Sequence, residues 1–152
     1  MSGPAAPVPA FAATLERWEP PMIERALVVF SGRSGLWWLR ILKPGFRHCF
    51  AVLHDGRNWL LYDPMSHVTQ LHSLPCASPA ALCEGLLARG YLVVPVRPRP
   101  VVRQPAPLGP FTCVEAVKRV LGLHARGVVT PWQLFRHLLK EEKILDIGIR
   151  SG

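Results

Sequence analysis

The sequence predicts an α+β domain in which an antiparallel sheet carries helices packed on one side. Three observations lead to this class. The first is a β-hairpin signal over residues 46–64, and the second is a pair of helix starts with capping residues at Thr112 and Thr130. The third is the order of the segments, which runs strand, hairpin, helix, strand, helix, helix. Strands joined by tight turns, with helices grouped apart from them, are typical of α+β folds.

Length and composition indicate one folded domain. The 152 residues are 49% hydrophobic and 18% charged, which provides a sizeable core and is unlike a disordered chain. We expect a single domain over residues 23–147, a mobile Pro/Ala-rich arm over residues 1–22 and a frayed C-terminus over residues 148–152. No apolar run reaches the ~18–20 residues of a membrane span, so no span is expected.

The charge balance favours anionic partners. The formal net charge is +8, which suits nucleic acid, an anionic membrane or cell-wall polymer, or an acidic protein. The basic residues are scattered, and no zinc-finger, ribonucleoprotein or basic-zipper motif is present. Nucleic acid is therefore expected as a partner only through general positive charge, and the N-terminal arm is a candidate for docking to a protein.

The hairpin is the centre of the prediction. Apolar runs flank Asp55-Gly56, which as the two loop residues of a type I′ turn would place His48 directly opposite Asp63. A four-residue loop from Asp55 to Asn58 would shift the register by two residues and make this pair diagonal, still within reach. A carboxylate beside an imidazole orients the ring and stabilises its protonated form. A polar pair without chemistry is the alternative.

Three short segments on either side of the hairpin are also expected to form secondary structure. Residues 26–30 and 67–72 are expected to be strands. Residues 35–42 are apolar on nearly all sides and fit a helical turn or a strand, with Trp37 and Trp38 lining a groove or lying at the core edge.

A helix and an edge strand are expected next. Ser78 is a candidate N-cap, and Gly90 is a candidate end for this helix. Pro95 favours an edge position for the strand over residues 91–96, because proline cannot donate to a neighbouring strand. The expected core stripe of the helix is Leu82, Leu86 and Leu87.

Two capped helices are expected in the last third of the chain. Thr112 and Glu115 form a Thr-x-x-Glu capping box, so Cys113 is predicted at the first helical position and Gly122 just past the helix end. Thr130 caps the second helix, with its box closed by Gln133 and its first position filled by Pro131. A short strand is expected over residues 144–149.

The cysteines differ in their surroundings. A thiol at the helix start, as predicted for Cys113, meets unpaired N–H groups and the positive end of the helix dipole, which favour a thiolate and can stabilise an oxyanion. The alternative for Cys113 is a small buried hydrophobe. Cys49 alternates with His48 and is expected in the core, while Cys76 and Cys83 are expected to be structural.

Neither disulfides nor metal ligation is expected. No Cys-x-x-Cys pair or zinc-finger spacing occurs, so free thiols in a reducing, cytoplasmic setting are favoured. A metal site built from His48, Asp63 and His67 is conceivable, but no ligand spacing supports it. We therefore expect no metal and no cofactor.

A helix-start cysteine, a strand histidine and an opposed carboxylate are what thiol acyl transfer requires. Cys113 would be the nucleophile, His48 the general base and Asp63 the group that orients His48. This arrangement resembles the circularly permuted papain-like cysteine peptidases and amidases, similar to the cell-wall-amidase-like and lecithin:retinol acyltransferase-like groups, in which the histidine precedes the cysteine helix. The resemblance covers residues 26–122 and includes Phe111-Thr112-Cys113-Val114-Glu115 at the helix start.

The resemblance implies a hydrolase that cleaves an amide, peptide or isopeptide bond through an acyl-enzyme. Its substrates would be a peptide, peptidoglycan or another acyl compound, including anionic ones. The sequence departs from the family where a glutamine often donates to the oxyanion, since Pro107 occupies that position and Gln104 is off-register. A thiol acyltransferase and a non-catalytic binding or structural protein on the same scaffold remain as alternatives. The chain also resembles small bacterial or prophage proteins, so a virion location is a further possibility.

Overall fold

The computed structural model describes residues 23–33, 37–75, 78–101 and 111–149. The N-terminal arm (residues 1–22) and residues 150–152 at the expected frayed end lie outside the described residues. The elements are β1 (Arg25–Ser31), η1 (Trp37–Ile41), β2 (His48–His54), β3 (Trp59–Pro64), β4 (Thr69–Leu74), α2 (Pro79–Ala88), β5 (Leu92–Val96), α3 (Cys113–Val120) and α4 (Pro131–Ile149). No helix in the described part of the chain is both long enough and apolar enough to cross a membrane.

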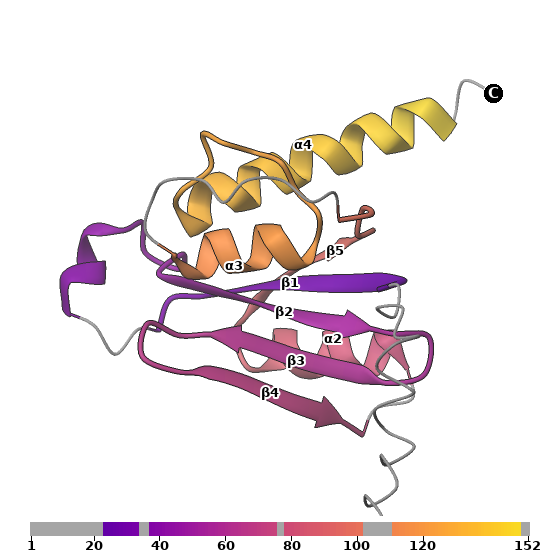
Figure 1. Cartoon of the computed structure of the whole chain (residues 1–152), viewed down its shortest axis with the longest axis horizontal. Coiled ribbons are helices and arrows are strands. Elements are labelled where there is room, and N and C mark those ends of the chain that lie inside the picture. The colour runs from indigo at the N-terminus through magenta and orange to yellow at the C-terminus, as the bar shows by residue number, and fades with distance from the viewer. Residues whose placement is uncertain (1–22, 34–36, 76–77, 102–110, 150–152) are drawn as a thin grey trace, which may run out of the picture.

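One five-stranded sheet forms the middle of the molecule (Figure 1). Its strand order is β4-β3-β2-β1-β5, and every neighbouring pair is antiparallel. The α+β class is thus confirmed. β5 lies at an edge, as its Pro95 predicted, because a residue without an N–H is tolerated where one side of the strand is unpaired.

The helices lie on both faces of the sheet, so the expectation of helices on one side was wrong. α3 and α4 pack against one face, and α2 packs against the other (Figure 1). The reason is visible in β1, whose Val28 and Phe30 belong to the first core while Leu27 and Val29 belong to the second. A strand that is apolar on both faces needs cover on both sides. 

Fewer leucines of α2 face the core than the sequence predicted. Leu86 is buried and Leu82 packs against the same core, but Leu87 is 54% exposed.

The turn of the hairpin has four residues, so the two-residue loop was the wrong choice and the alternative register is the observed one. Val52 faces Leu61, and His54 faces Trp59. A type I′ turn would need a positive φ at Asp55, but only glycines have positive φ among the described residues. The Asp55 carboxylate instead accepts hydrogen bonds from the backbone N–H groups two and three residues later, at 2.8 and 2.7 Å, which closes the longer loop.

The C-terminal segment is helical rather than a strand. α4 runs without interruption from Pro131 to Ile149, so residues 144–149 continue the preceding helix. A short apolar run has no decisive period of its own, and extending a helix already formed needs no new nucleation. The capping box at its start is confirmed: the Thr130 N–H donates to Gln133 Oε1 at 3.0 Å, and the Gln133 N–H donates to Thr130 Oγ1 at 3.3 Å.

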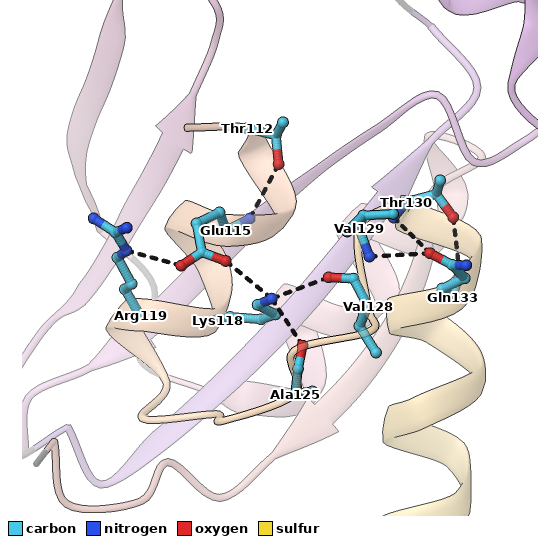
Figure 2. A network of polar contacts seen from close by, with 9 residues as sticks. All are labelled: Thr112, Glu115, Lys118, Arg119, Ala125, Val128, Val129, Thr130 and Gln133. Atoms are coloured by element: carbon cyan, nitrogen blue, oxygen red, sulfur yellow. Dashed lines mark hydrogen bonds and ion pairs between the residues drawn. The ribbon is translucent and has the colours of Figure 1, made fainter. Parts of the chain in front are cut away.

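A buried lysine ties α3 to the loop that leads into α4 (Figure 2). Lys118 Nζ donates to Ala125 O at 2.9 Å and to Val128 O at 3.0 Å, and it lies 2.9 Å from a carboxylate oxygen of Glu115. Gly122 provides the exit from α3 with a φ of +65°, and a Cβ there would lie 2.4 Å from Arg99 O. The end of α3 and the following loop are therefore held in one conformation.

Candidate active site

The three residues predicted to act together come from three elements that meet at one end of the sheet. His48 is the first residue of β2, Asp63 lies near the end of β3, and Cys113 is the first residue of α3. α3 packs against both of these strands. Thr112 caps α3 as predicted, since its Oγ1 accepts from the Glu115 N–H at 3.3 Å. The cap leaves Cys113 at the start of the helix, where the first backbone N–H groups have no partner within the helix itself.

His48 and Asp63 form a direct pair in spite of the shifted register. The distance from His48 Nε2 to Asp63 Oδ1 is 2.6 Å, and both side chains are largely shielded, at 17% and 20% exposure. The pair is diagonal across the hairpin, which is the geometry that the four-residue loop predicted. Since Asp63 engages Nε2, the other ring nitrogen, Nδ1, is the one available to Cys113.

The surroundings of His48 favour its protonated form. Burial alone would lower its pKa and is the largest single influence. Hydrogen bonds with Asp63 and Cys113, together with the negative charges of both groups, outweigh that effect and raise the pKa to about 9. His48 is therefore an imidazolium at neutral pH.

The surroundings of Cys113 favour the thiolate. A hydrogen bond from the Cys49 thiol is the largest influence and lowers the pKa, while burial raises it. The hydrogen bond with His48, the Cys49 backbone N–H and the charge of His48 lower it further, to about 4. Cys113 and His48 thus form an ion pair between about pH 4 and about pH 9.

Cys49 contributes to the site, although the sequence predicted only a core residue. Its burial is confirmed at 0% exposure, and Cys113 packs against the cluster that contains it. Because β2 alternates, Cys49 points to the α3 face, and this is the face on which Cys113 lies. The contact with Cys113, together with burial, raises the pKa of Cys49, so it stays a protonated donor to the thiolate. No motif could have indicated this, since the two cysteines meet only when α3 packs on the sheet.

Replacing Cys49 by alanine should raise the pKa of Cys113 by roughly one pH unit, because a hydrogen bond to a charged group is lost. Cys49→Ser keeps a donor of similar size at the same position and should restore most of the low pKa. The pKa is measured from the pH dependence of the thiolate absorbance near 240 nm. An unchanged pKa in Cys49→Ala would contradict a role for this thiol.

A pocket of about 690 Å³ opens beside the three residues. His48 and Cys113 line it, and most of the other walls are apolar. The apolar lining residues are Trp38, Leu39, Leu42, Pro64, Met65, Phe111, Val114, Val129 and Pro131. A nucleophile at the wall of an apolar pocket can meet a substrate there with little competing water.

The remaining predicted residues have varied positions. Trp38 lines the pocket from η1, which settles its segment as a helical turn, while Trp37 is 80% exposed. His67 lines the pocket but is exposed, and no group of three possible metal ligands occurs within the described ranges. Cys83 lies half-buried in α2. Cys76, Gln104 and Pro107 lie outside the described residues.

Comparisons with protein-family models, with curated proteins and with solved structures found no match to this chain. The chemistry of the site therefore follows from its own geometry. In this arrangement an ion-paired thiolate can attack a carbonyl carbon, the protonated imidazole can donate a proton, and N–H groups at the start of α3 can stabilise the oxyanion that forms.

Proposed function

We propose that this protein is a thiol-dependent hydrolase that cleaves an amide bond, in a peptide or isopeptide, through an acyl-enzyme. The observation that carries the proposal is that Cys113 and His48 lie together at the wall of one apolar pocket, with Asp63 hydrogen-bonded to His48 and with the thiolate and the imidazolium both favoured. The order of the three residues along the chain also supports a circularly permuted papain-like fold, which forms part of the same proposal.

The steps follow from the positions of the three groups. The Cys113 thiolate attacks the carbonyl carbon, and the carbonyl π electrons move to the oxygen, where N–H groups at the start of α3 stabilise the charge. As the C–N bond breaks, the His48 imidazolium gives its proton to the leaving amine. His48 then accepts a proton from water as that water attacks the thioester, which releases the carboxylic acid and the thiolate. Asp63 keeps the ring oriented throughout.

Acyl transfer to an amine is the second candidate, and the apolar walls of the pocket favour it. Walls that exclude water slow hydrolysis of a thioester, so an amine that binds in the pocket would compete well for the acyl group. Product analysis distinguishes the two reactions: hydrolysis releases a free acid, whereas transfer gives a new amide.

The first experiment is the pH dependence of alkylation by iodoacetamide, with the modified cysteine identified by mass spectrometry. Cys113 should react first, and its rate should rise through about pH 4 and stay level to about pH 9, because the thiolate is present throughout that window. An ordinary thiol would instead begin to react appreciably only near its pKa of ~8.5. A Cys113 that titrates in this ordinary way, or that does not react, would favour a non-catalytic binding protein on the same scaffold.

A further inference from the structure

Arg47 is a partly buried cation that the proposed reaction does not use. Its backbone N–H donates to Ser31 O at 2.9 Å, which fixes it just before His48, and its side chain forms part of the pocket wall. Nη1 reaches Gly32 O at the long distance of 3.4 Å. Nε is buried and has no hydrogen-bond partner among the described residues. A buried donor without a partner is unfavourable, so its presence calls for an explanation.

The unpartnered atom lies on the edge of the guanidinium that suits a carboxylate. Nε and Nη2 of an arginine form a side-on pair of donors that matches the two oxygens of a carboxylate, whereas Nη1 belongs to the other edge. Within the described part of the chain, no carboxylate forms an ion pair with Arg47, and Asp63 is engaged by His48. The protein thus supplies a prepared donor pair without supplying its acceptor.

Apart from the Cys113–His48 ion pair, the charged side chains among the described lining residues are the cations Arg33 and Arg47. The described lining residues include no aspartate or glutamate, so the net charge of this part of the pocket wall is positive. The thiolate does not use the charge of Arg47 either, since the pKa of Cys113 is lowered by Cys49 and His48. A positive pocket with apolar walls suits a ligand that is apolar in most of its bulk and carries one anionic group.

We propose that Arg47 binds a carboxylate of the substrate, so that the enzyme selects peptides or acyl compounds with a carboxylate close to the scissile carbonyl. This inference rests on the proposed function and adds the substrate class to it. The carboxylate pairs with Nη2, and a turn of the guanidinium that brings the buried Nε to the pocket surface gives Nε the acceptor that it lacks. The apolar walls hold the remainder of the acyl group. Because Arg47 lines the same pocket as His48 and Cys113, binding at Arg47 places the carbonyl near the reacting groups.

The test uses two alkylating reagents that differ in charge. Iodoacetate and iodoacetamide react with a thiolate in the same way, with a new S–C bond formed as iodide leaves, but only iodoacetate carries a carboxylate. The rate of each reagent at Cys113 is measured near neutral pH, and the ratio of the two rates is compared between variants. In Arg47→Gln we expect this ratio to fall roughly tenfold, because a charge-assisted bidentate contact is lost. Arg47→Lys keeps the positive charge but lacks the paired N–H donors of the guanidinium, and should give an intermediate ratio.

Arg57→Gln is the matched control, because it removes the same charge from an exposed residue in the hairpin turn, at the opposite end of the hairpin from His48. Its ratio should equal that of the wild type. An unchanged ratio in Arg47→Gln, with rapid reaction of iodoacetamide, would overturn the carboxylate site and leave the thiol mechanism intact. An equal fall in Arg57→Gln would also overturn it, since net charge alone would then explain the effect. If Cys113 reacts with neither reagent faster than an ordinary thiol, the proposed function fails and this inference fails with it.

Discussion

His48→Ala should lower the rate of Cys113 alkylation at about pH 6 by roughly 30- to 100-fold. The variant loses both the hydrogen bond and the positive charge that help to hold the thiolate, so the pKa of Cys113 moves from about 4 toward the ~8.5 of a free thiol. Only a few per cent or less of the thiol is then ionised at about this pH. Turnover of an amide should fall further, by about 10²–10⁴-fold, because the leaving amine also loses its proton donor.

The control for this prediction is His72→Ala, an exposed histidine of β4 outside the pocket lining. Its alkylation profile should match that of the wild type. If His48→Ala also leaves the profile unchanged, then Cys49 and the start of α3 would hold the thiolate without His48. The triad would lose its base under that result, even though Cys113 stayed reactive.

Lys118→Met should lower the free energy of unfolding by roughly 2–4 kcal/mol. Lys118 is 6% exposed, and its removal leaves two backbone carbonyls and one side of the Glu115 carboxylate without their donor (Figure 2). Leaving buried polar groups without partners is among the more destabilising changes that a single substitution makes. The loop held by Lys118 leads to Val129 and Pro131 in the pocket wall, so we also expect this part of the pocket wall to become more mobile.

The measurement is urea denaturation followed by tryptophan fluorescence, with Lys140→Met as control. Lys140 is exposed on α4, and its loss should change stability by no more than ~0.5 kcal/mol. Burial raises the pKa of Glu115, but its contacts with Lys118 and Arg119 outweigh this and hold it below the usual value. That contribution to stability is present above the ordinary pKa of a glutamate and is lost as the pH falls through the lowered one. The difference between Lys118→Met and wild type should therefore narrow in acid. Equal stability of the two proteins at neutral pH would contradict the role of this network.

Local patterns along the chain were enough to predict much of the fold. Capping residues act within one turn of a helix, so Thr112 and Thr130 marked the starts of α3 and α4 before any tertiary contact was known. Proline in β5 marked an edge for an equally local reason. The hairpin brought His48 and Asp63 together under either loop length, because a shift by two residues leaves both on the same face.

Tertiary packing decided what no local pattern contains. The cover on both faces of the sheet depended on how α2 returns across it. The length of the hairpin loop, by contrast, was decided locally, by the hydrogen bonds that Asp55 accepts from groups two and three residues later. The Cys49 thiol meets Cys113 only because α3 packs on the face to which Cys49 points.

The sequence by itself determined the α+β class, the starts of α3 and α4 and the three residues placed in the proposed mechanism, but not the type of residues 35–42 or 144–149. The tertiary structure alone decided the donor to the thiolate, the walls of the pocket and the unpartnered edge of Arg47. The physical reason is how far apart along the chain the interacting groups lie. Caps and turns depend on groups a few residues apart, whereas burial, pKa and pocket shape depend on groups brought together by the whole fold.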